Sequence, residues 1–409
     1  MKPRMSGLMK KEATRSILAS ILSIIIGLVV GCVIILIVGM TSDTLSPSSA
    51  WDGIRLIFGG LFSTGRDAAG ALTFGFNPTN IGNMLFRATP LILTGLSVAV
   101  AFKTGLFNIG GPGQFVVGAY VAVLIGVKCT FIPGPLLWIT CLVGAMLAGA
   151  LWGFVPGFLK AVCNVNEVIA CIMMNYIGMY GVNFLVVETI FDSQKNQSLP
   201  VAANANAPKL GMDQIFRSGA SASSVNAGIF VAILAGIVIY FLIAKTKFGY
   251  ELKACGYNRD AAKYAGINEK RSIILSMAIA GSLCALGGAC LYLAGAGKGI
   301  EVVDTLAAEG FNGIPVALLG LNNPIGIIFA GLFMAYLNQG GFNMQLYGFA
   351  PQVIEIIIAV IIYFAAFSLL LRGLVTKVVK RAGKGKASSQ NANAEPAKDG
   401  GTVKGGGEE

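Results

Sequence analysis

Residues Ile17–Met40 read ILASILSIIIGLVVGCVIILIVGM, and none of these 24 side chains is charged. A helix rises 1.5 Å per residue, so about 20 apolar residues cross the roughly 30 Å hydrocarbon core of a bilayer. A cleaved secretory signal has a shorter apolar core and ends in a small-residue cleavage site. This stretch therefore predicts a retained membrane-spanning helix.

The composition of the whole chain supports the same interpretation. Of the 409 residues, 55% are hydrophobic and 12% are charged, whereas a soluble domain carries about 25% charged residues. The chain is predicted to be an all-α, polytopic transmembrane helical bundle, and Gly149-x-x-x-Gly153 predicts a closely packed helix pair without naming the partner helix. Further spans are expected at about 84–102, 113–127, 135–159, 165–189, 226–244, 272–295 and 352–371.

The net charge of +11 is concentrated in three segments. Residues 1–16, 245–271 and 372–409 hold 20 of the 30 basic residues, and the other long polar loops are close to neutral. Basic loops stay in the cytoplasm, so both termini are predicted to be cytoplasmic, and topology explains the charge better than binding to nucleic acid. The expected organisation is a basic N-terminus 1–16, a transmembrane domain 17–371 with a cytoplasmic loop 245–271, and a disordered basic tail 372–409.

The excursion between the first two spans contains a predicted interfacial helix. The side chains of Trp51, Ile54, Phe58 and Leu61 share one helical face, as such a helix requires.

The stretch between the cytoplasmic loop 245–271 and the C-terminal tail must contain an even number of membrane crossings, because both of these segments are predicted to be cytoplasmic. Within it, the apolar stretch Gly310–Leu337 is interrupted by Asn322-Asn323-Pro324. Two half-length helices that turn at this polar sequence fit best. The predicted total is about ten spans, with broken or half-length helices.

Residue content excludes several kinds of chemistry. The sequence has no histidine, so His-ligated metals and Ser-His or Cys-His nucleophile pairs are excluded. The eight cysteines contain no Cys-x-x-Cys, and we interpret them as packing residues. A phosphate-binding G-x-x-x-x-G-K-[ST] motif is missing, because Gly297-Lys298 has Tyr292 at the first position and Gly299 at the last. No catalytic residue, metal site or bound cofactor is expected, and the chain is predicted not to be an enzyme.

The basic cytoplasmic loop contains a short predicted helix. Asn258 can cap its N-terminus and Gly266 suits the position after its C-terminus, while Ala261, Ala262 and Ala265 supply a face of small side chains. This helix could be an ordinary part of the loop, or it could dock into a groove on a cytoplasmic partner. The pattern leaves both interpretations open.

The same loop, KFGYELKACGYNRDAAKYAGI at 247–267, resembles that of permease subunits of bacterial ABC importers for sugars, branched-chain amino acids and nucleosides. Three further stretches are similar to the nucleoside-type branch: FNIGGPGQF (107–115), NEVIACIMMNY (166–176) and GFNGIPVALLGLNNP (310–324). The resemblance covers residues 80–371. It implies a multi-pass permease of the bacterial plasma membrane that translocates nucleosides.

The resemblance also implies partners. A separate ABC ATPase subunit would bind and hydrolyse ATP, a second related permease would complete the path, and an extracytoplasmic lipoprotein would deliver the solute. The short helix would then be the coupling helix that contacts the ATPase. The residues expected to make this contact are Asn258, Ala261, Ala262, Tyr264, Ala265 and Gly266.

A polar solute needs hydrogen-bonding groups along its path. Asn and Gln side chains can both donate and accept, and aromatic rings can stack on a base. Asn108 and Gln114 are the strongest candidates, because they flank Gly110-Gly-Pro-Gly113, which should interrupt a helix within the membrane. The other candidates are Phe107, Phe115, Asn175, Tyr176, Asn183, Asn312 and Glu355. The alternative for each is that it only satisfies a neighbouring helix or a broken helix end.

Other functions stay open from the sequence. A permease of the same group could import a pentose or another sugar. An ion-coupled secondary transporter or a channel would also have about ten spans, but it should carry an intramembrane pair or ring of carboxylates, and Glu355 is the one well-placed acid. A membrane-embedded enzyme fits less well, since the sequence lacks histidine and a paired carboxylate arrangement.

Overall fold

The computed structural model describes residues 22–38, 40–41, 47–68, 70–219, 221–295, 298–346 and 348–366. Residues 30–362 form one compact unit, and the described residues 22–29 and 363–366 belong to a second. The predicted N-terminal segment 1–16 and the predicted tail 372–409 lie outside the described residues.

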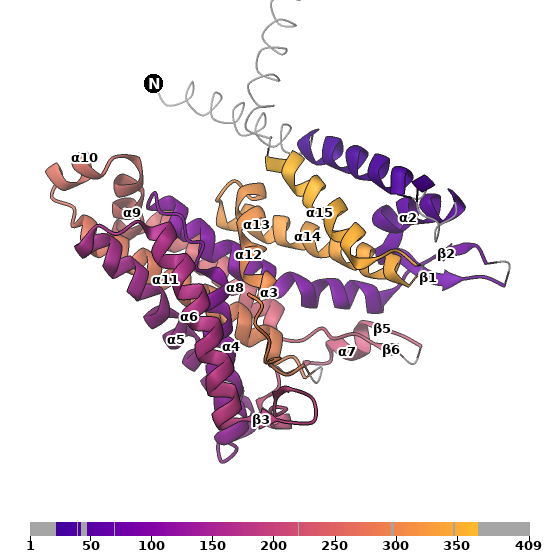
Figure 1. Cartoon of the computed structure of the whole chain (residues 1–409), viewed down its shortest axis with the longest axis horizontal. Helices are drawn as coiled ribbons and strands as arrows, with labels where there is room; N and C mark the ends of the chain where they lie inside the picture. Colours follow the sequence, from indigo (N-terminus) through magenta and orange to yellow (C-terminus); the bar gives the residue numbers. More distant parts are fainter. Residues whose placement is uncertain are drawn as a thin grey trace, which may run out of the picture. The chain divides into compact units, whose positions relative to one another are not determined.

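The described chain is mostly helical, as predicted (Figure 1). Seven of its helices are long and apolar enough to cross a membrane: α3 (Pro78–Lys103), α4 (Gly111–Lys128), α5 (Gly134–Cys163), α6 (Glu167–Thr189), α8 (Gly228–Lys245), α11 (Glu269–Tyr292) and α14 (Pro324–Gln345). The first six overlap the spans expected between residues 84 and 295. The total of about ten spans and the cytoplasmic position of the termini stay predictions.

Shorter elements connect these helices. They are the apolar helix Leu22–Val38, α2 (Pro47–Gly59), α7 (Met212–Ile215), α9 (Lys247–Tyr257), α10 (Arg259–Tyr264), α12 (Ala308–Phe311), α13 (Gly313–Leu319), α15 (Pro351–Ala366) and the 3-10 turns η1 (Gly60–Phe62) and η2 (Ala203–Ala205). Three antiparallel hairpins pair β1 (Ser63–Arg66) with β2 (Leu72–Phe74), β3 (Phe191–Asp192) with β4 (Gln197–Ser198), and β5 (Arg217–Ser218) with β6 (Ser221–Ala222). In α2 the rings of Trp51 and Phe58 are exposed on the face that the sequence predicts.

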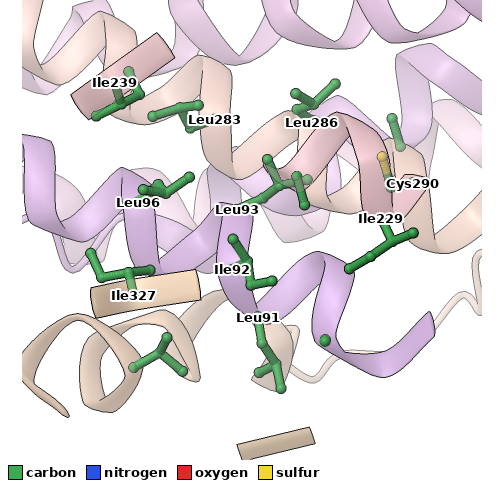
Figure 2. Close-up of a cluster of buried hydrophobic side chains, with 14 of the residues drawn as sticks. Leu91, Ile92, Leu93, Leu96, Ile229, Ile239, Leu283, Leu286, Cys290 and Ile327 are labelled. Carbon is green, nitrogen blue, oxygen red and sulfur yellow. The ribbon is translucent and has the colours of Figure 1, made fainter. Parts of the chain in front are cut away.

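The core of residues 30–362 is built around α3 and α11. In the most apolar window of each helix, 78% of α3 and 72% of α11 is buried, against 33% for each of α5, α6 and α8. Figure 2 shows the contact region: Leu93 and Leu96 of α3 lie among side chains of α8, α11 and α14, including Leu286 and Ile327. The two central helices therefore have no broad surface left for lipid, whereas α5, α6 and α8 form part of the periphery.

Glycines allow α5 and α11 to pack backbone against backbone. A Cβ added at Gly281 would lie 2.1 Å from the carbonyl oxygen of Gly149 and 3.1 Å from the Cα of Gly153. Such close approach is the usual role of small residues in membrane helix pairs, where apolar burial alone gives little driving force. The structure thus supplies the partner helix of Gly149-x-x-x-Gly153, which the sequence did not identify.

The expected pair of half-length helices is only half correct. The chain does turn at the predicted place, with Asn322 at φ 52° and the Asn323 side chain capping α14. The helix before the turn, α13, has seven residues, but α14 has 22 residues and is full-length.

The apolar stretch predicted to end at Leu337 continues as α14 through the polar sequence Asn338-Gln-Gly-Gly341 to Gln345. The Gln339 amide donates to Asn80 Oδ1 at 3.3 Å, and the Asn343 amide donates to the carbonyl oxygen of Gly60 at 2.7 Å. A Cβ added at Gly340 would lie 2.9 Å from the carbonyl oxygen of Leu56, so this glycine is a contact site for α2.

Candidate functional site

The chain between α3 and α4 is not helical. α3 ends at Lys103, Gly105 takes a positive φ of 70°, and α4 begins only at Gly111. A helix start leaves backbone N–H groups without partners, and Gly110 offers no side chain to cap them. The side chain that fulfils this role comes from another helix: Asn175 of α6 accepts a hydrogen bond from the Gly113 N–H at 2.9 Å.

Asn175 is used at both ends of its amide. Besides accepting from Gly113, it donates from Nδ2 to the carbonyl oxygen of Ile109 at 3.0 Å. The side chain is buried, at 1% exposure. It therefore links the middle of α6 to the non-helical segment. This contact agrees with the alternative that such a side chain satisfies a broken helix end.

Asn108 and Gln114 bind each other. The Asn108 Nδ2 donates to Gln114 Oε1 at 2.9 Å, and the Gln114 Nε2 donates to Asn108 Oδ1 at 3.2 Å. Asn108 Oδ1 also accepts from the Gly110 N–H at 3.0 Å. Each side chain is 1% exposed. These hydrogen bonds link the segment before the start of α4 to the first turn of α4, inside the fold. Contact of either side chain with the solute stays a prediction.

Replacement of Gln114 by Leu is expected to lower the amount of protein in the membrane several-fold. The Asn108 amide would lose its 2.9 Å acceptor, and a buried group without its partner costs about 1–3 kcal/mol. The protein that remains should transport with an unchanged KM, measured as uptake normalised to membrane protein. A variant present at the normal level with a raised KM would place Gln114 in contact with the solute instead.

The three sequence stretches at 107–115, 166–176 and 310–324 meet at one place. Asn175 joins the first two, and a Cβ added at Gly111 would lie 2.4 Å from the carbonyl oxygen of Gly310, which joins the first to the third. Glycine is needed on both sides of this contact because the two backbones touch. Segments far apart in sequence thus build one junction at the start of α4.

A cavity of about 290 Å³ lies directly beside this junction. Its walls come from Pro112 and Val116 of α4, Asn175, Met179 and Asn183 of α6, Tyr292 of α11, and residues 298–301, 303 and 305–309. Pro112 and Asn175 belong to the junction itself, and Asn183 lies two helical turns further along α6. The cavity therefore extends from the junction toward the end of α6 that leads into β3, away from α9 and α10 (Figure 1).

Polar side chains and side chains of both charges lie around the cavity. The Asn183 amide donates to the carbonyl oxygen of Val303 at 3.0 Å and to Asp304 Oδ1 at 3.3 Å. Lys298 Nζ lies 3.6 Å from Glu309 Oε1 and 5.4 Å from the centre of the Tyr292 ring. This arrangement offers donors, acceptors and an aromatic ring to a polar solute. Among the described residues, no group of three or more His, Cys, Asp or Glu side chains could hold a metal ion.

Only some of the residues predicted to lie along the solute path line the cavity. Asn175 and Asn183 line the cavity. The ring of Phe107 stacks on Phe102 with 5.4 Å between centroids, and Phe115 is fully buried. The remaining three lie outside the cavity lining: Asn312 is half-buried where α12 meets α13, Glu355 is exposed on α15, and Tyr176 is exposed on α6.

Several cavity residues were not among the sequence candidates. Lys298 and Glu309 belong to the segment that follows α11, and they form an ion pair in the wall of the cavity. Tyr180, which lies outside the cavity lining, was also not a candidate; it lies one helical turn beyond Tyr176 and three residues before Asn183. A search of the apolar span for polar or aromatic side chains at i, i+4 and i+7 would have found this row.

The predicted helix in the basic loop is present as α10. The Asn258 side chain accepts from the Ala261 N–H at 2.9 Å, and Gly266 ends the helix with a φ of 78°. Ala265 is exposed, and Tyr264 is 94% exposed. Figure 1 shows α9 and α10 at one end of α11, α6 and α5, with β3 at the other end.

The predicted small-residue face of α10 is divided. Ala261 and Ala265 are exposed, but Ala262 is only 3% exposed and faces its own chain. A six-residue helix packed on one side can present only part of its circumference, and Ala262 lies on the packed part. Contact between an ATPase and any of these residues stays a prediction.

Apolar helices, a non-helical junction inside the bundle and a polar cavity beside it define a membrane transport protein. The chain belongs to the family described as the permease component of branched-chain amino acid transport systems, whose family model matches residues 80–366. It is a permease subunit, hence a transport subunit and not an enzyme, and a multi-pass protein of the bacterial plasma membrane. No solved structure matches it.

This chain is similar to several ABC transporter permeases whose solutes are named. The guanosine ABC transporter permease NupP of Bacillus subtilis is 40% identical over 74% of this chain and 85% of its own length. The nucleoside ABC transporter permease NupB of Lactococcus lactis is 35% identical over 79% and 92%. The glucose ABC transporter permease TsgB13 of Haloferax volcanii is 33% identical over 72% and 77%. A second permease of each of the two bacteria, NupQ and NupC, matches at 26% and 28% identity.

Proposed function

We propose that this chain is the permease subunit of an ATP-driven importer of nucleosides. The observation that carries the proposal is its similarity, over 74% and 79% of the chain, to permeases named for guanosine and for nucleosides. A nucleoside is a neutral solute with an aromatic base and several hydroxyl groups. The amide of Asn183, the Lys298–Glu309 pair and the Tyr292 ring suit such a solute at the cavity.

A sugar is the second candidate solute. The similarity to a glucose permease favours it, and sugar hydroxyls could use the same donors and acceptors around the cavity. The aromatic groups distinguish the two candidates, because a base offers two flat faces for stacking whereas a sugar offers mainly hydroxyls.

Energy would come from ATP bound to a separate subunit. The exposed end of α10, with Tyr264 and Ala265, supports this, since it offers an uncovered surface on a basic loop that the charge distribution assigns to the cytoplasm. An ion-coupled transporter finds less support. Its one candidate acid at membrane depth, Glu355, is exposed on α15 and lies outside the cavity lining.

Two further partners complete the proposal. A second related permease is supported by the similarity of this chain to two different permeases in each of two bacteria. A substrate-binding lipoprotein would deliver the solute at the opposite side of the membrane from α10. The cavity supports that direction, because it extends toward the end of α6 that is remote from α10.

Competition for uptake tests the identity of the solute. Cells that lack this chain should take up little labelled guanosine, and the restored chain should return uptake. We expect unlabelled nucleosides to compete with the label, and glucose and leucine to leave it unchanged. Competition by glucose alone would favour the sugar permease, and equal uptake with and without the chain would contradict import by this protein.

A further inference from the structure

The exposed face of α6 differs from those of the other peripheral helices. In α5, α6 and α8 the same share of the apolar window is buried, 33%. Near the middle of α8 the exposed side chains are Leu234, Ile237 and Val238, and near the middle of α5 they are Met146, Leu147 and Leu151. Near the middle of α6 the exposed side chains are Ile177, at 56%, and two tyrosines, Tyr176 and Tyr180, at 45% and 55%.

These two tyrosines lie at an unusual depth. α6 has 23 residues, so it is about 34 Å long, close to the thickness of the hydrocarbon core. Tyr176 and Tyr180 are each two residues, about 3 Å, from its centre at Gly178. Membrane tyrosines gather at the two interfaces, where the hydroxyl group reaches water. These two are near the position where a lipid-facing hydroxyl is least favourable.

Neither hydroxyl has a hydrogen-bond partner among the residues that the structure describes. A hydroxyl group moved from water to an apolar solvent without a partner loses about 4–8 kcal/mol. The exposed apolar rows of α5 and α8 carry no such penalty. The strip of α6 that carries the two tyrosines is therefore poorly suited to lipid, and water, a solute or another protein must cover it.

The tyrosines lie outside the cavity lining but share one row of α6 with a residue that lines it. Tyr176, Tyr180 and Asn183 are spaced i, i+4 and i+7, so they form one row along the helix, which we call the α6 polar row. Asn183 lines the cavity, and Met179 and Asn175 occupy the adjacent row of the same wall. The α6 polar row thus leads from the cavity along the outside of α6 toward the end that carries Glu167.

We propose that the α6 polar row faces the path of the solute and that the rings of Tyr176 and Tyr180 stack on the base of a nucleoside in transit. This inference rests on the proposed function for the identity of the solute. Two rings one turn apart present successive stacking surfaces, and stacking accepts any base because every base has a π face. Asn183 adds an amide oxygen that can accept a hydrogen bond at the cavity end of the row, while its Nδ2 already donates to Val303 and Asp304.

Two substitutions at Tyr180 separate the ring from the hydroxyl. Tyr180→Leu removes the stacking surface and should raise the KM for guanosine roughly five- to a hundredfold, the range that loss of one base–aromatic contact spans. Tyr180→Phe keeps the ring and should restore most of the affinity. Val238→Leu in α8 is the matched control at a similar depth, and its KM should be unchanged.

The same variants distinguish the other possible coverings. If the α6 polar row faced lipid, Tyr180→Leu would transport normally at a normal or higher protein level, which would overturn the proposal. If the row only packed against the partner permease, Tyr180→Leu would reduce co-purification of that partner and leave KM unchanged, which would also overturn it. Normal assembly with a raised KM supports it.

Chemical access gives a readout that does not depend on the rate of transport. Tyr180→Cys in the full complex should react with a membrane-impermeant thiol reagent, and guanosine should slow the reaction. Val238→Cys is the lipid-facing control and should stay unlabelled, with the unmutated protein setting the background of its own cysteines. Absence of labelling at Tyr180→Cys would overturn the exposed path.

The labelling also separates this inference from the proposed function. Protection of Tyr180→Cys by glucose, with none by guanosine, would leave α6 on the path but would overturn stacking on a base. If guanosine uptake does not depend on the chain, the proposed function fails by itself, and only protection by a different aromatic solute would then keep the stacking role.

Discussion

The variant Ala265→Glu is expected to abolish uptake while the protein stays in the membrane at its normal level. Ala265 is exposed at the end of α10, so a longer charged side chain has room in the free chain. A negative charge at a helix C-terminus is unfavourable by only about 0.3–1 kcal/mol. If a partner ATPase covers α10, the same charge would be buried without a counter-ion, which costs several kcal/mol and reduces coupling by far more than tenfold.

The control for this prediction is Ala265→Ser, which is small and neutral and should keep most of the uptake. Membrane protein level, uptake and co-purification of the ATPase are measured for both variants. Ala262→Glu is a poor substitute, because Ala262 is buried and the charge would disturb α10 itself. Full uptake and full co-purification in Ala265→Glu would rule out docking at this end of the helix.

Gly281→Ala is expected to reduce the amount of folded protein several-fold, although it adds one methyl group. The new Cβ would lie 2.1 Å from the carbonyl oxygen of Gly149, which is backbone and cannot move away without separating α5 from α11. Forced overpacking costs about 1–3 kcal/mol, and losses of this size change abundance several-fold. The measurement is the level of full-length protein in the membrane and its thermal stability in detergent.

The matched control is Gly181→Ala in α6. A Cβ added at Gly181 meets nothing within 4 Å, so the same substitution should be neutral or slightly stabilising, as replacing a helical glycine by alanine usually is. Equal protein levels for the two variants would contradict the backbone contact between α5 and α11.

Much of the helical fold could be predicted from the sequence, because charge is excluded from membrane spans and polar loops mark their ends. The apolar blocks from 84 to 295 predicted six long helices, and all six are present. The end of α14 could not be predicted this way. Its polar side chains Gln339 and Asn343 donate to Asn80 Oδ1 and to the Gly60 carbonyl oxygen, and both acceptors precede them by more than 250 residues.

The site was harder to predict than the fold, because several of its polar contacts join segments that are distant in the sequence. The sequence predicted that Gly110-Gly-Pro-Gly113 interrupts a helix, whereas the non-helical segment ends at Gly110 and α4 begins at Gly111. The sequence also did not show that the Asn108 and Gln114 amides pair with each other. It also did not show that Asn175 caps the start of α4 from another helix. Local patterns predict which groups are polar, whereas tertiary contacts decide which of them have no partner left for a solute.

If ATP drives nucleoside uptake through this chain, accumulation of labelled guanosine should depend on ATP and not on ion gradients. Cells carrying the chain and its partner subunits are depleted of ATP while their proton and sodium gradients are held. We expect accumulation against the guanosine gradient to stop, and we expect collapse of the ion gradients with ATP maintained to leave accumulation intact. Accumulation that continues without ATP and stops when the ion gradients collapse would show that ions, and not ATP, drive this transporter.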